Sequence, residues 1–397
     1  MLLAAATWVI YVFIGLIAMA IMVFAAQVAV AFLSGSLRPS PMAALRPTVT
    51  VLVPAHNEAS GIVTTCDALR SQLVPGDRLL VVADNCSDQT ASLARMAGAT
   101  VMERRDDTRI GKGYALAFGL RRLEEDPPEI LVVVDADCTP GPEAVSRLAR
   151  TCAAVQRPVQ ANYRMRSPPG ASLRLRVAEF AGIVKNLVRP LGYRRLGLPC
   201  LLMGTGMAFP WRIVEQTDFA TGHLVEDMKL ALELAAAGFP PYYCPEAEVN
   251  STLPESDSGF IAQRARWEHG HLGLILSDVP TAFVASIGKR NLPQLAMALD
   301  ILVPPLSFLV MLAAISIAAS GAIWWVSGAA VPLTVSAATL LVLGIAVGLA
   351  WWKFARESIS ARELALLPLY ALAKLPLYLR FFHRRQARWV RSPRKGE

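Results

Sequence analysis

Residues 130–138 read ILVVVDADC, an apolar and mostly β-branched run that ends at two carboxylates, Asp135 and Asp137. Such a run is typical of a buried parallel strand, and open α/β sheets bind ligands at the carboxyl ends of such strands. In an extended chain, residues two apart point to the same side, and adjacent carboxylates repel each other unless a cation lies between them. Because Mg²⁺ prefers carboxylates together with substrate phosphates, the stretch predicts a metal-diphosphate site. The alternative is a strand end with two solvated Asp residues.

The composition of the 397 residues indicates a membrane protein with one large aqueous domain. Apolar residues make up 54% of the chain and are concentrated in residues 7–33 and after about residue 295. The formal net charge is +8, and residues 380–397 hold six Arg and one Lys against one Glu. A basic segment beside apolar segments favours an anionic membrane face over nucleic acid as a partner. The six Cys lack C-x-x-C spacing, which favours reduced thiols over a zinc site or a disulfide framework.

The first apolar segment predicts an N-terminal transmembrane anchor within residues 1–36. Residues 7–33 carry no charge and are long enough to cross a hydrocarbon core of roughly 30 Å. A signal peptide is the alternative, but no Lys or Arg precedes Arg38. Arg38 and Arg46 follow the segment, and positive residues favour the cytoplasmic side. We therefore expect a multi-pass protein of the plasma (inner) membrane with a cytoplasmic middle domain.

The last part of the chain, residues 276–397, is predicted to hold an interfacial helix, two transmembrane helices at about residues 295–319 and 329–352, and the basic tail. Asp300 lies near the cytoplasmic end of the first of these, so an interfacial Asp is expected there. Residues 364–382 are apolar but contain two Pro and a Lys, which favours a re-entrant or interfacial helix. A fourth span is the alternative.

The middle of the chain alternates between short apolar strands and amphipathic helices after a Pro/Ser/Arg linker at residues 37–48. This alternation predicts a parallel sheet with ligands at its carboxyl edge. Residues 172–191 are predicted to form one amphipathic, Arg-containing helix. Polar clusters follow the strands where that rule requires them, at His56-Asn57-Glu58, Asp84, Lys112 and Asp135-Asp137.

Seven segments occur in an order similar to that of family 2 inverting glycosyltransferases of the GT-A fold. They are VPAHNE, VVADNCSDQT, GKGYAL, VVVDADC, GTGMAFP, VEDMKLALEL and QRARW. The likeness is to the membrane-bound group that includes cellulose, chitin and hyaluronan synthases and exopolysaccharide glycosyltransferases. It covers about residues 48–275 and implies an α/β fold, with a Rossmann-like mixed sheet, for a cytosolic domain of residues 37–275. It also implies a UDP-sugar donor that carries glucose or N-acetylglucosamine.

The resemblance implies roles for individual residues. Asp227 matches the general base that takes a proton from the acceptor hydroxyl in a single displacement. Asp137, with Asp135, would hold Mg²⁺ or Mn²⁺ against the donor diphosphate. The alternatives are helix capping by Glu226 and Asp227 and turn capping by Asp84. The implied donor-binding residues are Asp84, Lys112, Glu58, Asp135 and Arg266, and the implied acceptor-binding residues are Trp267, Gly204, Thr205, Gln263 and Glu226.

The acceptor and the partners stay open in the sequence. A growing polysaccharide is expected from the resemblance, and transfer of one sugar to a lipid or lipid-linked acceptor is the alternative. Membrane lipid and other export or assembly subunits are expected partners, and a non-catalytic membrane subunit is an alternative of another class. A dinucleotide-dependent dehydrogenase is excluded, because PAHNE follows the first strand where that class needs G-x-G-x-x-G.

Overall fold

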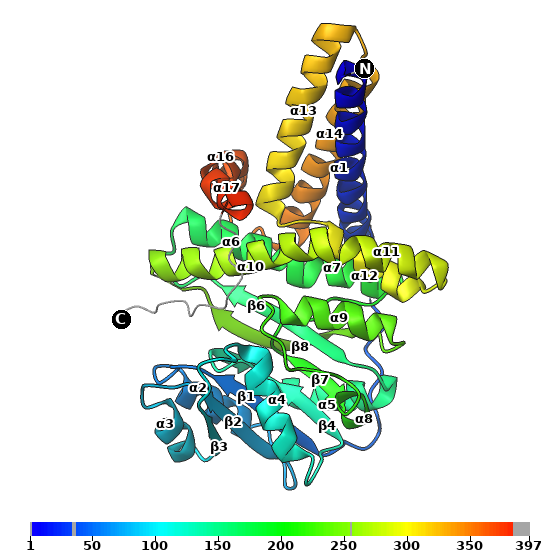
Figure 1. The fold of residues 1–397 in the computed structure, drawn as a ribbon. Helices are drawn as coiled ribbons and strands as arrows, with labels where there is room; N and C mark the ends of the chain where they lie inside the picture. Colours follow the sequence, from blue (N-terminus) through cyan, green and yellow to red (C-terminus); the bar gives the residue numbers. More distant parts are fainter. Residues whose placement is uncertain (1, 34–36, 255, 384–397) are drawn as a thin grey trace.

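The computed structural model describes residues 2–33, 37–254 and 256–383. Its centre is an eight-stranded mixed sheet with the strand order β3-β2-β1-β4-β7-β6-β8-β5 (Figure 1). The strands are β1 (Val49–Ala55), β2 (Arg78–Asp84), β3 (Thr100–Arg104), β4 (Ile130–Val133), β5 (Cys138–Pro140), β6 (Val159–Arg166), β7 (Met207–Pro210) and β8 (Tyr242–Thr252).

Strand β4 lies in the middle of this sheet. It pairs in parallel with β1 and antiparallel with β7, so the sheet changes from parallel to mixed at β4. All four residues of β4 are buried, because helices cover both faces of the sheet. The predicted α/β fold with a mixed, GT-A-like sheet is therefore confirmed, and the Asp135-Asp137 pair follows its central strand.

Two groups of helices form the two apolar layers against the sheet. Cys66, Ala94 and Leu148 of α2, α3 and α5 pack against one face, and Leu116 and Ala231 of α4 and α9 pack against the other. The bounds are α2 (Ile62–Arg70), α3 (Thr90–Met96), α4 (Lys112–Leu123), α5 (Ala144–Val155), α8 (Trp211–Val214) and α9 (Glu226–Ala236).

A further layer of helices lies between the sheet and three long helices (Figure 1). Its members are α6 (Leu173–Ile183), η1 (Val184–Val188), α7 (Arg189–Arg195), α10 (Asp257–Ser277), α11 (Val279–Gly288) and α12 (Leu292–Leu302). The single helix predicted at residues 172–191 is interrupted, because η1 is a π-helical turn. Such turns carry an inserted residue and occur often at functional sites.

Three long helices, α1 (Leu2–Leu33), α13 (Leu306–Ser327) and α14 (Val331–Phe354), pack together through a shared apolar core. All three contain segments long and apolar enough to cross a membrane, which indicates a membrane protein. A fourth candidate exists if α10 and α11, which are bent by 44° at their junction, count as one span.

The apolar helices of the C-terminal part differ in their bounds from the prediction. The segment predicted to span at residues 295–319 is divided into α12 and α13, because Pro304 and Pro305 at the break lack N–H donors. The helix predicted at residues 364–382 is likewise divided into α15 (Ala361–Leu364), α16 (Leu367–Ala373) and α17 (Leu375–His383), with a Pro in the first turn of α16. The basic tail beyond residue 383 lies outside the described residues, and the predicted domain boundaries at residues 36 and 275 stay predictions.

A buried polar cluster joins α1, α7 and α12. Arg189 forms an ion pair with Asp300 at 2.6 Å, and Gln27 Nε2 donates to the same Asp300 oxygen at 2.6 Å. Arg189 Nε also donates to Gln27 Oε1 at 3.0 Å. Asp300, which we expected to lie at the membrane interface, is therefore buried and paired with Arg189 and Gln27. Gly192 of α7 lies so close to α1 that a Cβ on this residue would overlap the carbonyl oxygen of Gln27.

Candidate active site

The two carboxylates after β4 form one oxygen-rich cluster. Ligand atoms of Asp135, Asp137 and Cys138 lie within 4.8 Å of one another. Burial raises the pKa of the Cys138 thiol well above its usual range, and Mg²⁺ and Mn²⁺ prefer oxygen ligands to soft sulfur. Two carboxylates that leave further positions to phosphate and water are the donor set that Mg²⁺ and Mn²⁺ prefer. The residues therefore fit a divalent cation.

Lys112, the first residue of α4, reaches this cluster. Its ammonium forms an ion pair with Asp135 and donates to the carbonyl oxygen of Gly204 at 2.7 Å. Burial opposes the charge, but the carboxylates of Asp135 and Glu226 outweigh it and raise the pKa of Lys112. Lys112 is thus a fixed positive charge beside the predicted metal ligands.

Helix α9 brings two more carboxylates to the same place. Glu226 and Asp227 occupy its first turn, and the Met228 N–H donates to Asp227 Oδ1 at 2.8 Å. Burial raises the pKa of Glu226 to about 7, and the neighbouring Asp227 adds to the shift.

Gly204 lies where these groups converge. A Cβ on Gly204 would lie 3.3 Å from Lys112 Nζ, 3.4 Å from Asp227 Oδ2 and 3.9 Å from Asp135 Oδ2. The backbone at Gly204 has a φ of +85°, which favours glycine. Three predicted site residues from β4, α4 and α9 therefore meet around one backbone position.

Gly204→Ala is expected to lower any activity of this site about 100-fold, because displacement of a reactive group by about 1 Å has an effect of that size. The matched control is Gly238→Ala, since Gly238 has a φ of +89° but no atom within 4 Å of the added Cβ. The measurement is turnover of the two purified variants beside their unfolding temperatures. Equal losses in both variants would show that backbone strain, and not crowding at the site, causes the effect.

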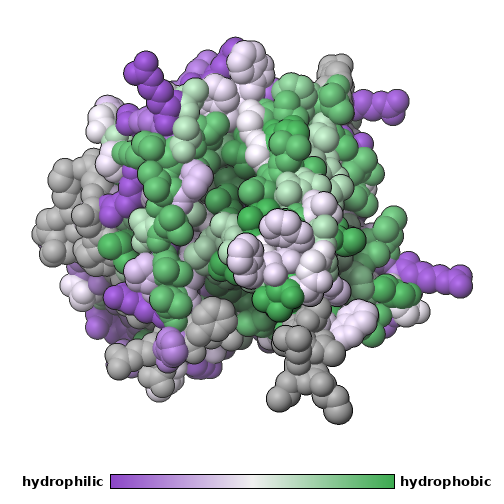
Figure 2. All heavy atoms as spheres, turned by 90° about the horizontal axis from the view of Figure 1, so that it is seen from above, coloured by the Kyte–Doolittle hydropathy of each residue, from purple (hydrophilic) through white to green (hydrophobic). Residues whose placement is uncertain are grey.

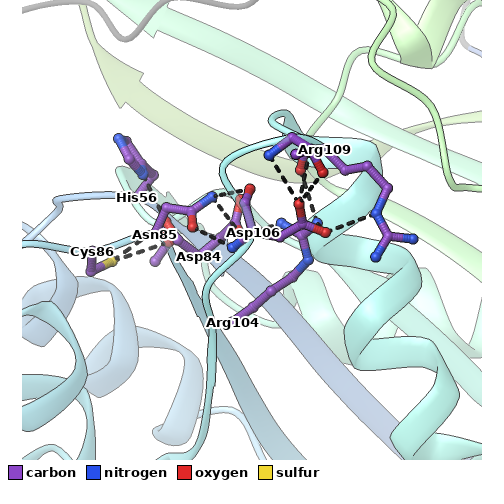
Figure 3. A network of polar contacts seen from close by, with 9 residues as sticks. His56, Asp84, Asn85, Cys86, Arg104, Asp106 and Arg109 are labelled. Carbon is purple, nitrogen blue, oxygen red and sulfur yellow. Dashed lines mark hydrogen bonds and ion pairs between the residues drawn. The ribbon is translucent and has the colours of Figure 1, made fainter.

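Asp84, at the end of β2, is held in a network of polar contacts (Figure 3). Arg104 forms an ion pair with Asp84 at 2.6 Å, and both side chains are buried. The His56 ring donates to the Asp84 carbonyl oxygen at 2.7 Å, and Arg104 also contacts Asp106 at 3.1 Å. Burial raises the pKa of Asp84, and Arg104 offsets part of this shift. A buried ion pair, and not the turn capping that was the alternative interpretation, therefore fixes the position of Asp84.

A cleft of about 900 Å³ runs along the carboxyl edge of the sheet. Its volume lies within the range of ordinary ligand sites, roughly 300–1,000 Å³. Residues predicted to bind the donor or the metal line it together, namely Glu58, Asp84, Lys112, Asp135, Asp137 and Arg266. We call this space the donor cleft.

A second cavity of about 210 Å³ starts at Asp135 and Asp137, which also line the donor cleft, and runs toward the long helices. Gln263 and Arg266 of α10 line both spaces, whereas Trp267 lines only the second. Gly204, Glu226 and Asp227 also line the second space, which we call the inner cavity. The structure therefore separates most predicted acceptor residues from the donor cleft, with Asp227 on the inner side.

Thr205 is the predicted acceptor residue that the structure places elsewhere. Its side chain is fully buried, and its hydroxyl accepts a hydrogen bond from the Asp135 N–H at 3.0 Å. Thr205 therefore positions the backbone of the carboxylate pair. The sequence carries no signal for this role, because it depends on β4 and the segment before β7 lying side by side.

Comparisons with known proteins identify the family of this chain. A model of the family described as glycosyltransferase like family 2 matches residues 47–270, more than half of the chain. The chain belongs to this family. The predicted membership of family 2 glycosyltransferases is confirmed, and the match spans all strands of the sheet.

Relatives within glycosyltransferase family 2 differ in the sugar named. The chain is 27% identical to a probable glycosyltransferase, YdaM, of Bacillus subtilis over 60% of this chain and 58% of that one. It is 24% identical to an N-acetylglucosaminyltransferase of Rhizobium leguminosarum and 27% identical to a probable glucomannan 4-beta-mannosyltransferase of Arabidopsis thaliana, over 56% and 58% of this chain. These matches cover 55% and 45% of the two relatives, so the chain spans about half their length.

A solved structure of the mannosyltransferase PcManGT from Pyrobaculum calidifontis, in complex with GDP-Man and Mn²⁺, is similar over 94% of this chain and all of that one. The TM-score is 0.57 and the sequence identity is 20%, so this likeness shows the fold.

Proposed function

We propose that this family 2 glycosyltransferase transfers a hexose, glucose or N-acetylglucosamine, from a UDP-sugar to an acceptor hydroxyl by single inverting displacement. The observation that carries the proposal is the meeting of Lys112, Asp135 and Asp227 around Gly204. This point lies where the donor cleft and the inner cavity join, so a donor and an acceptor can approach each other from opposite sides.

On the donor side, the leaving diphosphate needs its charge stabilised. Asp135 and Asp137 would hold Mg²⁺ or Mn²⁺, which supplies positive charge to the diphosphate. Lys112 is fixed beside them by Asp135 and Gly204, and Arg266 lines the cleft from α10. Two positive side chains and a bound metal would together stabilise the charge that develops when the nucleotide leaves.

On the acceptor side, Asp227 would accept the proton of the attacking hydroxyl. Its carboxylate faces Gly204 and the inner cavity, and it accepts a hydrogen bond from the Met228 N–H. Trp267 supplies an aromatic face to the same cavity, which suits the apolar face of a sugar ring. Gln263 would support the sugar at the junction of the two spaces.

We further infer a cytoplasmic catalytic domain at the plasma membrane, since Arg38 and Arg46 follow the N-terminal apolar helix and positive residues favour the cytoplasmic side. A growing polysaccharide, supported by export subunits, is one acceptor that this arrangement accommodates. A lipid-linked acceptor is favoured by one observation, namely that the inner cavity reaches Leu306 and Leu309 of a candidate membrane span.

The proposal is tested with the purified full chain in a membrane mimetic and a panel of UDP-glucose, UDP-N-acetylglucosamine and GDP-mannose. Release of the nucleoside diphosphate and the mass of the product identify the donor and separate single addition from polymerisation. GDP-mannose is included because relatives named as mannosyltransferases match this chain. Absence of turnover with every donor would favour a non-catalytic membrane subunit.

Removal of divalent cations with EDTA is expected to reduce transfer to background, and Mn²⁺ or Mg²⁺ is expected to restore it. Asp137→Ala should lower transfer by more than about 100-fold, since metal stabilisation of the leaving group is worth several kcal/mol. The exposed Asp107→Ala is the matched control and should retain activity. Full activity in metal-free buffer would overturn the metal assignment.

A further inference from the structure

The inner cavity connects the catalytic carboxylate to the base of the long helices. Asp227 lines one end, and Phe24 of α1 with Leu306 and Leu309 of α13 line the other. Lys185 of the π-helical turn η1 and Arg264 of α10 lie on the wall between these ends. The cavity therefore passes from charged to apolar surroundings, as a site for an amphipathic molecule would.

Some of the basic side chains that line this cavity form ion pairs with carboxylates. Arg189 pairs with Asp300 at 2.6 Å, and Lys374 pairs with Glu268 at 2.5 Å. Such pairs leave little net charge for a ligand. A charged ligand would therefore be bound by side chains outside these pairs.

Lys185 and Arg264 are two basic side chains outside these pairs, and Arg266 is a third, at the junction with the donor cleft. Among the residues that the structure describes, neither Lys185 nor Arg264 forms an ion pair with a carboxylate, and Lys185 forms no hydrogen bond. Arg264 donates to the Ala178 carbonyl oxygen at 3.1 Å, and its guanidinium lies 5.4 Å from the Phe260 ring centre and 5.8 Å from that of Trp267. Burial lowers the pKa of Lys185, and Asp227 offsets part of that effect. Lys185 is half-buried, and a partly desolvated cation without an ion-pair partner is stabilised by a bound anion.

Hydrogen bonds to two strands of the sheet hold the π-helical turn that carries Lys185 in place. Asn186 Nδ2 donates to the Tyr163 carbonyl oxygen at 3.2 Å, and the Tyr243 hydroxyl donates to the Asn186 carbonyl oxygen at 3.0 Å. Both contacts fix η1 against β6 and β8. The ammonium of Lys185 is thus presented to the cavity by a supported backbone, which is what a built binding site requires.

The apolar end of the cavity adjoins a surface suited to lipid. Figure 2, which views the molecule along the long helices, shows an apolar face with a hollow in it. Leu369, Leu372 and Leu379 of α16 and α17 are at least half exposed. Tyr378 of α17 lies against Phe308 of α13, with ring centres 4.5 Å apart. The short helices α16 and α17 therefore form a wall beside the apolar end of the inner cavity.

We propose that the inner cavity binds a membrane lipid whose sugar or polyol head group is joined to its tail through a phosphate, with Lys185 and Arg264 holding that phosphate. The head-group hydroxyl would lie at Asp227, and the tail would leave beside Leu306 and Leu309 of α13. A phosphate suits the site because Arg and Lys together bind its several oxygen atoms. This inference rests on the proposed function, since it names the class of acceptor.

With such an acceptor, one bond to the anomeric carbon of the donor sugar breaks and one forms. The anomeric carbon of the donor sugar exchanges its bond to the nucleoside diphosphate oxygen for a bond to the head-group oxygen. The electron pair of the broken bond leaves with the nucleoside diphosphate. The hydroxyl proton passes to Asp227, and the lipid phosphate is unchanged.

The test measures binding of two soluble probes, octyl glucosyl phosphate and octyl glucoside, to the purified full chain by calorimetry. The probe with the phosphate should bind roughly tenfold or more tightly than the neutral one, because one charge-assisted hydrogen bond has that effect. Lys185→Gln should remove this preference and Lys185→Arg should keep most of it. The matched control, Lys289→Gln, changes an exposed Lys and should leave the preference intact.

Equal binding of the two probes to the unaltered chain, or a preference that survives Lys185→Gln, would overturn the inference. Nucleotide affinity is measured in the same samples and should not change, since Lys185 does not line the donor cleft. Failure of the unaltered chain to bind the nucleotide or to transfer a sugar would instead count against the proposed function. The two failures are therefore distinguishable.

Discussion

Asp227→Asn is expected to lower sugar transfer by about 1,000-fold, within the range of roughly 10²–10⁴ that one general base contributes. Asn keeps the shape of the side chain but cannot accept the proton of the attacking hydroxyl. Asp227 Oδ2 faces Gly204 beside Lys112 and Asp135, so the altered atom lies at the centre of the cluster. The measurement is initial rate with the donor that the panel identifies.

Nucleotide affinity should change little in the Asp227→Asn variant, because Asp227 does not line the donor cleft. Calorimetric titration of the nucleoside diphosphate with metal provides this second readout. The exposed Asp107→Asn is the matched control and should keep both activity and affinity. If transfer and nucleotide binding fall together, Asp227 belongs to the donor site and another group is the base.

Arg189→Met is expected to lower the free energy of unfolding by about 3–5 kcal/mol, because it leaves the carboxylate of Asp300 buried without its cation. The Arg189–Asp300 pair is almost fully buried, at 6% exposure of each side chain, so water cannot replace the lost partner. The same change removes the hydrogen bond from Arg189 to Gln27 of α1. Thermal unfolding of the detergent-purified variants gives the measurement.

The double variant Arg189→Met, Asp300→Leu distinguishes loss of the ion pair from loss of the packing of the Arg189 side chain. Replacement of both partners of a buried pair by apolar residues is often neutral, so most of the stability should return. The exposed Arg122→Met, which breaks only a surface pair with Glu125, should change stability by less than about 1 kcal/mol. A double variant as unstable as the single one would show that packing of Arg189, and not its charge, holds the helices together.

Local patterns in the sequence predicted the fold class and most of the candidate site. The apolar run before Asp135 is buried in β4, and the alternation of strands and helices predicted the parallel part of the sheet, β3-β2-β1-β4, whereas its mixed character was implied by the family resemblance. Predicted residues that follow different strands, such as Glu58, Asp84 and Asp135, line one cleft, and Arg266, which the family resemblance implied, lines it from α10. This succeeds because strand and helix periodicity reports which face is buried, and residues after parallel strands meet at one edge.

By itself the sequence determined the sheet, the carboxylates at its edge, the family and the presence of long apolar helices. Only the tertiary structure decided that Asp300 pairs with Arg189, that Thr205 supports Asp135, and that Lys185 faces a cavity next to Asp227. Periodicity describes one element at a time, so it carries no information on which side chains of separate elements will meet. Those contacts follow from how the elements pack, and a π-helical turn within a predicted α-helix changes which side chain faces the cavity.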